Sequence, residues 1–159
     1  MRVFVTVGSM LPFDRLIRAM DDWAGAHPHA SVFAQIGEST LRPAHIECSA
    51  FVSPPEFRRH FATCDIVVSH VGMGTVITAF ECAKPIIMLP RRPELAEVTS
   101  NHQLATAKWL QGRPGIRIVH SEHELGPALE RGRAAEGASR IETGTRARLV
   151  EALREFIAG

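Results

Sequence analysis

The sequence predicts an α/β fold, a Rossmann-like doubly wound sheet of about six mostly parallel strands. Short apolar segments alternate along the chain with segments whose apolar residues recur at helical spacing. This alternation is typical of a parallel sheet with helices on both faces. Most of the strand segments are largely apolar, as expected of strands buried on both sides. The chain has 159 residues and no apparent internal repeat, so we expect one domain over residues 1–159.

Six segments are predicted strands. The first two are apolar runs that end in Gly, and the third is a weaker example of the same pattern. The fifth is entered through Lys84 and Pro85. The predicted strands are Arg2–Gly8, Ser31–Gly37, Ile46–Val52, Asp65–Ser69, Pro85–Leu89 and Ile116–Val119.

Six other segments are predicted helices. The first has its apolar residues on one face, and Pro54 and Pro55 suit the first turn of the second. The predicted helices are Asp14–Trp23, Glu56–Ala62, Thr75–Cys82, Asn101–Leu110, Glu122–Leu129 and Arg146–Ile157. Between the last two, Gly132–Gly144 is rich in Gly, Ala and Arg, and we expect a mobile loop there.

The composition is that of a globular protein with little net charge. Hydrophobic residues make up 45%, charged residues 22%, and the formal net charge is +1. This balance gives no electrostatic support for nucleic-acid binding. Three cysteines without a CxxC pattern indicate reduced thiols in a cytoplasmic protein. We find no signal-peptide pattern and no apolar run near the ~20 residues that span a bilayer.

Ligands of doubly wound sheets bind beyond the carboxyl ends of the strands. The segments that follow four of the predicted strands are unusually polar or rich in glycine. These segments are Gly8–Met10, Gly37–Glu38, His70–Thr75 and Arg91–Gln103. We therefore expect a ligand site at this edge of the sheet.

The sequence after the fourth strand favours phosphate binding. Gly72, Met73, Gly74 and Thr75 join a strand to a helix, and backbone N–H groups at a helix start attract anions. The alternative is a tight turn capped by Thr75. His70, just before this turn, is by itself more typical of a structural histidine.

The turn after the first strand is a second candidate contact. Gly8 would allow close approach of a phosphate or sugar, and Ser9 could form a hydrogen bond with it. The alternative is an ordinary strand-to-helix turn. Because the GxGxxG pattern is absent, the sequence disfavours NAD binding.

Glu81 is the single acid on an otherwise almost uncharged helix. One carboxylate can accept hydrogen bonds from both hydroxyls of a ribose, and the spacing from the glycine turn favours that role. The alternatives are a structural hydrogen bond or a solvated helix face.

Polar residues also surround the loop after the fifth strand. Asn101, His102 and Gln103 suit sugar hydroxyls, although Asn101 could act only as an N-cap. Arg91 and Arg92 could bind a phosphate or carboxylate, or pair on the surface with the glutamates at positions 94 and 97. The motifs of Walker nucleotide binders, serine hydrolases and zinc sites are absent, and we expect no metal.

Two segments together suggest a family. They are VTVGSM near the start, and DIVVSHVGMGTVITAFECAKPIIMLPRR followed by NHQLATAKWL. They resemble the C-terminal, donor-binding half of family 28 glycosyltransferases of the GT-B fold, which includes the peptidoglycan enzyme MurG. The similarity is greater still to stand-alone subunits of split bacterial exopolysaccharide transferases of the PssE type.

The resemblance implies a role for each candidate residue. It places the diphosphate at the glycine turn, the ribose at Glu81, and the donor sugar or its phosphates at Asn101, His102 and Gln103. Gly8 and Ser9 would also touch the donor, with a uracil wall near Ile36 or Phe51. The donor would be a UDP-sugar, and no cofactor or metal is implied, because helix N-termini and polar groups neutralise the leaving diphosphate.

The resemblance also implies a partner. Family members with both halves are about twice this length, and their other half carries the acceptor site and the general base. We therefore expect a membrane-anchored partner subunit, a lipid-linked saccharide acceptor, and peripheral attachment to the inner face of the cell membrane. A hexosyl or glucuronosyl group would be transferred with inversion, only in the presence of the partner. The last predicted helix, with Leu149, Leu153, Phe156 and Ile157, is a candidate docking surface or ordinary core.

Two other functions stay open. The chain could be a non-catalytic accessory subunit that stabilises a glycosyltransferase partner, in which case it would not bind the donor. It could also be a stand-alone hydrolase or epimerase of a UDP-sugar, in which case the isolated chain would turn over the donor.

Overall fold

The six predicted strands form one parallel sheet in the computed structural model, which describes residues 1–135, 147–148, 151–152 and 155. The strands are β1 (Arg2–Thr6), β2 (Ser31–Gln35), β3 (Glu47–Ser49), β4 (Ile66–His70), β5 (Ile86–Leu89) and β6 (Ile116–Ile118). Their order is β3-β2-β1-β4-β5-β6. The chain moves outward from β1 to β3 on one side and from β4 to β6 on the other, so the topological switch point lies between β1 and β4. The predicted doubly wound sheet is confirmed.

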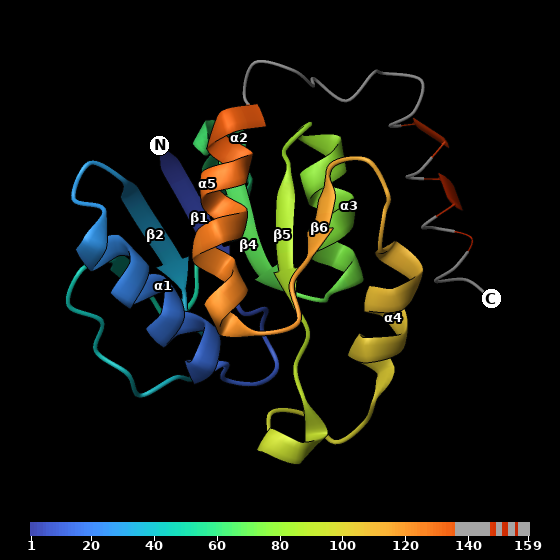
Figure 1. Cartoon of the computed structure of the whole chain (residues 1–159), viewed down its shortest axis with the longest axis horizontal. Coiled ribbons are helices and arrows are strands. Elements are labelled where there is room, and N and C mark those ends of the chain that lie inside the picture. Colours follow the sequence, from blue (N-terminus) through green and yellow to red (C-terminus); the bar gives the residue numbers. More distant parts are fainter. Residues whose placement is uncertain (136–146, 149–150, 153–154, 156–159) are drawn as a thin grey trace.

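Helices cover both faces of the sheet, as Figure 1 shows. In this view α1 (Asp14–Ala26) and α5 (Leu125–Ala135) lie in front of the sheet, while α2 (Pro54–Thr63) and α3 (Met73–Glu81) lie behind it. The helix α4 (His102–Leu110) packs beside β6. Two short 3-10 helices, η1 (Pro93–Leu95) and η2 (Glu122–Glu124), occur in the connections after β5 and β6.

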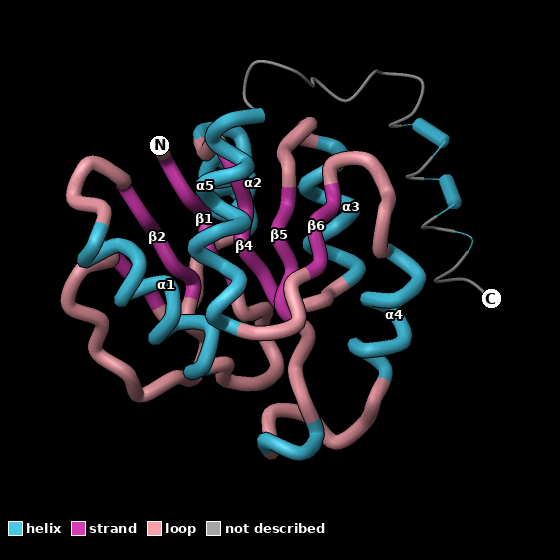
Figure 2. The backbone as a smooth tube through the Cα atoms, in the orientation of Figure 1, coloured by secondary structure: helices cyan, strands magenta, loops and turns pink. Residues whose placement is uncertain are grey.

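Alternate residues of each strand point to opposite faces and so build two separate cores. Val3 and Val5 of β1 pack in the core under α1 and α5, whereas Phe4 between them packs in the core under α2, α3 and α4. Aromatic rings fix α2 on the sheet. The ring centroids of Phe4 and Phe61 lie 5.3 Å apart in an edge-to-face contact, and those of His60 and Phe33 lie 4.0 Å apart in a stacked contact. The sheet is therefore a rigid base for the loops at its carboxyl edge, which lie at the bottom of Figure 2.

Several predicted boundaries are corrected. The α3 helix begins at Met73 rather than Thr75, so Thr75 lies inside the helix and Gly72 takes the N-cap position. The start of the predicted mobile loop is wrong, because residues 132–135 continue α5. Gly132 serves close packing there, since a Cβ atom would lie 3.0 Å from Ile66 Cδ1.

The rest of that predicted loop lies outside the described residues, as does most of the predicted helix Arg146–Ile157 with its candidate docking surface. Within the described part of the chain, no helix is both long and apolar enough to cross a bilayer.

Candidate functional site at the carboxyl edge of the sheet

A cleft of about 440 Å³ opens at the switch point of the sheet. It is bounded by the carboxyl ends of β1 and β2 and by the first turns of α2 and α3. Its lining residues are Thr6, Gly8, Ser9, Gln35, Val52, Pro54, Phe57, Arg58, Gly74, Thr75 and Thr78. A cleft at this position is where ligands bind in open α/β sheets. The structure thus brings four predicted donor contacts, Gly8, Ser9, Gly74 and Thr75, to one site.

The α3 wall of the cleft is suited to an anion. The N-cap residue Gly72 offers no side-chain hydrogen bond to the first turn of the helix, so the backbone N–H groups there are available to a ligand. A Cβ atom built on Gly74 would have no neighbour within 4 Å. Among the residues that the structure describes, Arg58 is the only charged one that lines the cleft, and it adds positive charge to the partial charge of the helix start.

His70 supports this edge from below. A Cβ atom on Gly8 would lie 2.7 Å from His70 Cε1, and one on Gly72 would lie 2.4 Å from His70 Nε2. The two glycines therefore allow the histidine ring to pack between the turns that follow β1 and β4. Burial, together with the nearby charge of Arg91, lowers the pKa of His70 to about 4, so the ring is neutral at physiological pH.

Three polar side chains form a row across the sheet beneath the cleft. Thr6 is in register with Gln35 on one side and with Ser69 on the other, and all three residues are buried. Thr6 Oγ1 accepts a hydrogen bond from Gly8 N at 3.2 Å, and Ser69 Oγ donates to His70 O at 2.8 Å. Gln35 Oε1 is buried and has no hydrogen-bond partner in the described structure.

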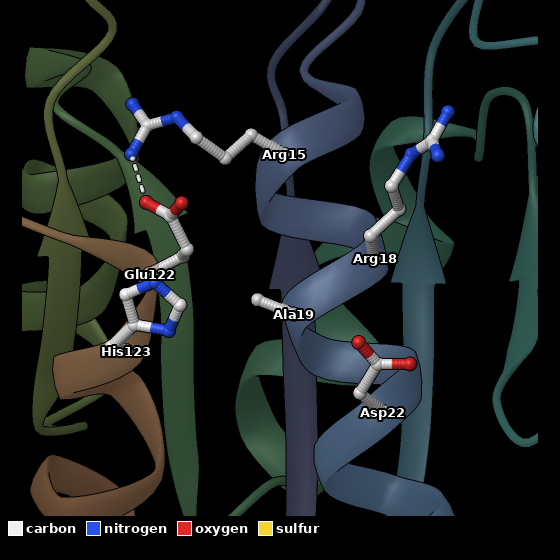
Figure 3. Close-up of a pocket in the computed structure, with 6 residues that line it drawn as sticks. All are labelled: Arg15, Arg18, Ala19, Asp22, Glu122 and His123. Carbon is white, nitrogen blue, oxygen red and sulfur yellow. Dashed lines mark hydrogen bonds and ion pairs between the residues drawn. The ribbon is translucent and has the colours of Figure 1, made fainter.

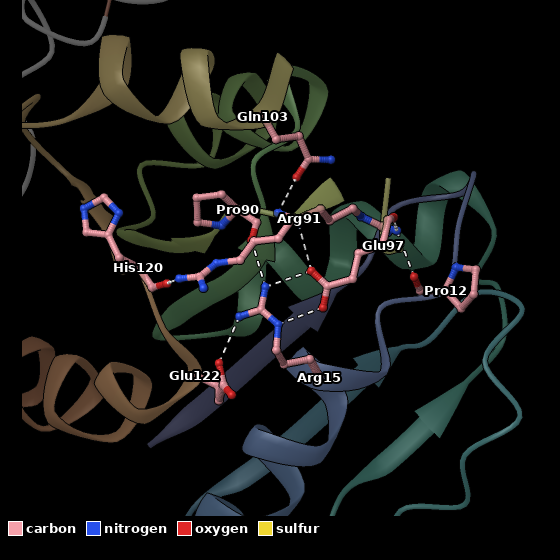
Figure 4. Close-up of polar contacts among 9 residues, drawn as sticks. Pro12, Arg15, Pro90, Arg91, Glu97, Gln103, His120 and Glu122 are labelled. Atoms are coloured by element: carbon pink, nitrogen blue, oxygen red, sulfur yellow. Dashed lines mark hydrogen bonds and ion pairs between the residues drawn. The ribbon is translucent and has the colours of Figure 1, made fainter. Parts of the chain in front are cut away.

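Arg91 has a structural role in this geometry, and its predicted contact with the donor stays a prediction. Its side chain is buried, and its guanidinium donates to the carbonyl oxygens of Val7, Leu11 and Pro12 at 2.6–2.8 Å. Its backbone N–H donates to Gln103 Oε1 at 3.1 Å. Arg91 therefore ties the loop after β1 to the loop after β5, as Figure 4 shows.

Glu97 organises the same loop. It accepts two hydrogen bonds from Arg15 at 2.7 and 2.8 Å and one from the backbone N–H of Arg92. The Arg92 guanidinium donates to His120 O. The alternative of a surface pairing between Glu97 and the Arg91 or Arg92 side chain is therefore wrong, because the Glu97 carboxylate pairs with Arg15 of α1 and both side chains are largely buried.

A second depression, of about 430 Å³, lies between α1 and η2. Arg15 spans its rim and bonds to Glu122 at 3.0 Å, as Figure 3 shows. Its lining mixes both signs of charge, from Arg15, Arg18, Asp22 and Glu122. None of the predicted donor contacts lies there, so we place the candidate site at the switch-point cleft.

The other predicted contacts do not line this cleft. Asn101 and His102 are exposed at the start of α4, and Asn101 makes no side-chain capping bond. Met73 packs against the core under α3. Glu81 is the last residue of α3, seven residues beyond Gly74 and so roughly 10 Å farther along the helix axis. The residue of α3 that faces the cleft there is Thr78, so this geometry does not support the predicted ribose contact of Glu81.

The sequence analysis missed Gln35, Arg58 and Thr78. Gln35 had a visible signal, since it is the one polar side chain near the end of an apolar strand segment, SVFAQIG. Arg58 had none, because one arginine in a polar helix is ordinary. No group of three or more His, Cys, Asp or Glu side chains that could hold a metal ion is found in the part of the chain that the structure describes.

Comparisons with known proteins identify the family. The model of the glycosyltransferase family 28 C-terminal domain matches residues 2–132. A curated relative from Prochlorococcus marinus (strain MIT 9312) is 30% identical over 89 residues, which is 54% of this chain and 23% of that protein. That relative is the UDP-N-acetylglucosamine–N-acetylmuramyl-(pentapeptide) pyrophosphoryl-undecaprenol N-acetylglucosamine transferase.

Solved structures share the fold. Acinetobacter baumannii MurG has a TM-score of 0.60 at 15% identity, over 96% of this chain and 49% of that one. The glycotransferase of kitacinnamycin has a TM-score of 0.62 at 20% identity, over 97% and 38%. This chain therefore spans less than half the length of these proteins.

The solution structure of ALG13 has a TM-score of 0.63 at 16% identity, and the match covers 96% of both chains. The fold is thus known both as half of a longer glycosyltransferase and as a chain of this size. Since the family model covers most of the sequence, this protein belongs to the glycosyltransferase family 28 C-terminal domain family.

Proposed function

We propose that this chain is the donor-binding catalytic subunit of a two-component inverting glycosyltransferase. It would move a hexosyl or glucuronosyl group from a UDP-sugar to a lipid-linked acceptor in exopolysaccharide biosynthesis. The observation that carries this proposal is the switch-point cleft, where an open helix start at Gly74 and the lone charge of Arg58 favour an anion. The named activity of the Prochlorococcus relative supports a UDP-sugar as that anion.

The diphosphate of the donor would lie at the start of α3, within reach of Ser9 and Thr75. In the reaction, the acceptor oxygen forms a bond to the anomeric carbon on the face opposite the diphosphate. The bond from that carbon to the diphosphate oxygen breaks, and its electron pair leaves with UDP. The proton of the acceptor hydroxyl passes to a general base on the partner. The N–H groups of α3 and the Arg58 cation stabilise the charge that develops on UDP, which is the main contribution this chain can make to the rate.

The exposed residues Asn101 and His102, at the start of α4, would contact the sugar end of the donor. They follow β5 and do not line the cleft, so they would contact the part of the donor that extends beyond the cleft toward the partner subunit. Gln103 would hold the same loop in place through its hydrogen bond to Arg91. We propose no metal in this mechanism, because the helix start and Arg58 supply the positive potential.

The partner would cover the carboxyl edge of the sheet. Five large apolar side chains are exposed in the described structure, and all lie in or just after loops that follow the carboxyl ends of strands. They are Met10, Leu11, Phe51, Leu95 and Leu104. Exposed apolar residues gathered on one side of a domain are typical of an interface. A membrane-anchored subunit that carries the acceptor site would bury them and hold this chain at the inner face of the membrane.

Calorimetry with the purified chain tests donor binding. UDP should bind, and the Arg58→Ala variant should bind it about 5- to 30-fold more weakly, because a charge-assisted contact to phosphate contributes about 1–2 kcal/mol. Arg59→Ala is the matched control, since Arg59 is an exposed neighbour on the same helix that does not line the cleft. If both variants lost the same affinity for UDP, Arg58 would act only through the overall positive charge of α2 and not through a contact in the cleft.

Transfer activity separates the proposal from its alternatives. Sugar transfer from UDP-glucose, UDP-galactose, UDP-glucuronate or UDP-N-acetylglucosamine should require the partner subunit. If the isolated chain consumed a donor, it would be a hydrolase or epimerase. If the complex were active while the chain bound no UDP, the chain would be an accessory subunit.

A further inference from the structure

We propose that Gln35 reads the nucleobase of the donor, with its side-chain amide hydrogen-bonded to the imide edge of uracil. This inference rests on the proposed function, and it assigns a residue that neither the sequence motifs nor the family comparison singles out. Its basis is one buried amide that lines the cleft and lacks an internal hydrogen-bond partner.

The position of Gln35 in the sheet makes the missing partner informative. Phe33 and Gln35 project from β2 to the same face, two residues apart, and Phe33 packs in the core beneath α2. Continued apolar packing at position 35 would be the simplest way to complete that core. The chain has instead a glutamine there that is 7% exposed. A buried amide oxygen without a partner costs free energy, so its presence at a cleft needs an explanation.

The neighbours of Gln35 do not supply that explanation. Thr6 and Ser69 belong to the same row of polar side chains, but the Thr6 hydroxyl accepts from Gly8 N in the turn after β1, and the Ser69 hydroxyl donates to His70 O at the end of β4. Gln35 makes no such bond to the turn after β2. Because Gln35 lines the cleft, rotation about its last side-chain torsion, which has a broad energy profile, would present the amide to a ligand.

The chemistry of the amide selects the part of the ligand. The atom without a partner is an acceptor, so it requires a donor, and phosphate oxygens at neutral pH have none to offer. The imide edge of uracil offers N3–H between two carbonyl oxygens. A glutamine amide, with an acceptor and two donors, can accept from N3–H and donate to one neighbouring carbonyl.

The surroundings of Gln35 fit a planar base. Val52, Pro54 and Phe57 line the same cleft and provide apolar walls. Gly74 and Thr75, which belong to the proposed phosphate region, lie on α3. The cleft therefore combines apolar side chains and one amide with a helix start and a cation suited to an anion, which matches the base and the diphosphate of a nucleoside diphosphate.

The test uses the full chain, with UDP and 3-methyl-UDP as probes. Methylation removes the N3–H donor and leaves the diphosphate unchanged. The wild type should bind UDP at least about tenfold more tightly than 3-methyl-UDP, given the contribution of one or two hydrogen bonds. In Gln35→Met, an unbranched apolar replacement of similar size, the affinity for UDP should fall by about tenfold. The preference for UDP over 3-methyl-UDP should disappear.

Stability gives an independent readout. Gln35→Met removes an acceptor that has no partner, so the melting temperature should stay the same or rise. Thr6→Val is the contrast, because it removes the acceptor of the Gly8 N–H and should lower the melting temperature. If a substitution lowers the affinity for UDP without lowering stability, the original residue serves ligand binding and not the fold.

The outcomes separate this inference from the proposed function. If the wild type binds UDP and Gln35→Met keeps both the affinity and the preference over 3-methyl-UDP, the role of Gln35 is refuted and donor binding stands. If Gln35→Met is as unstable as Thr6→Val and keeps the preference, Gln35 is a structural residue. If the wild type binds no UDP, both proposals are wrong.

Discussion

Gly72 and Gly74 stand two residues apart in one turn, yet substitution by alanine should affect them in opposite ways. A Cβ atom at position 72 would lie 2.4 Å from His70 Nε2, whereas one at position 74 would meet nothing within 4 Å. Since ordinary contacts begin near 3.4 Å, Gly72→Ala requires the histidine ring to move by about 1 Å in a packed site. Such overpacking costs about 1–3 kcal/mol.

Gly74→Ala should instead stabilise the free protein, because alanine is favoured over glycine within a helix by up to about 1 kcal/mol. For a chain of this size, 1 kcal/mol corresponds to about 2–4 °C in melting temperature. Gly72→Ala should therefore melt roughly 2–12 °C below the wild type, and Gly74→Ala at or slightly above it. Calorimetric titration should then show weaker UDP binding by Gly74→Ala, whose methyl group enters the cleft.

A double mutant isolates the cause. In the His70→Ala background the ring is absent, so Gly72→Ala should lose most of its cost, with a coupling free energy of about 1–3 kcal/mol. Urea unfolding measures all four variants. If Gly72→Ala is as stable as Gly74→Ala, or if its cost is unchanged without His70, the assignment of Gly72 to histidine packing is incorrect.

Four further predictions follow from the same geometry. His70 has its pKa lowered to about 4, so protonation favours the unfolded chain. The neutral ring contributes fully to the free energy of unfolding above pH ~6.5, and this contribution falls by about 2 kcal/mol at pH 5. Urea unfolding should therefore show that His70→Gln loses less stability than the wild type between pH 7.5 and 5. Arg91→Lys should cost about 2–4 kcal/mol in unfolding free energy, because a lysine cannot satisfy the same set of buried carbonyls, whereas Arg92→Lys should cost well under half of that. Thr78→Val should weaken UDP binding measurably by calorimetry, while Glu81→Ala, outside the cleft, should leave it within about twofold; the reverse order would restore Glu81 as the ribose contact. Leu95→Glu and Phe51→Glu should each reduce copurification with the partner, whereas Leu95→Met should not, and full retention by both acidic variants would place the interface elsewhere.

The fold was predictable because its signals are local. Continuous apolar runs mark strands buried on both faces, and their alternation with helical periods leaves a parallel sheet as the natural solution. The errors lie where tertiary contacts override local preference. Gly132 appeared to begin a loop, but it continues α5 because its missing side chain lets the helix approach Ile66. The α3 helix was predicted to begin at Thr75, but it begins two residues earlier, at Met73.

The site was predictable only in part, for a related reason. The glycines and Ser9 follow strand ends, so topology alone brings them to one edge. Arg91 also follows a strand end, and sequence could not show that its guanidinium turns inward to the carbonyl groups of the loop after β1. Those contacts join residues about 80 positions apart, and no local pattern encodes them. Glu81 lies on the same helix as Gly74, Thr75 and Thr78, but the sequence could not show that these three, and not Glu81, line the cleft.

The buried polar residues of the carboxyl edge separate what holds the site from what the site is for. Thr6, Ser69 and Arg91 each have internal partners: Thr6 and Arg91 hold the loop after β1, and Ser69 bonds to the last residue of β4. His70 fills the space that two glycines leave open. Beside this set of satisfied groups, Gln35 keeps an acceptor unpaired and Gly74 keeps a helix start open. A fold under selection for stability alone would have filled both positions, since an apolar side chain at 35 and alanine at 74 carry no evident cost in the free protein. Their retention in one cleft is best explained by a ligand that offers both a hydrogen-bond donor and an anion.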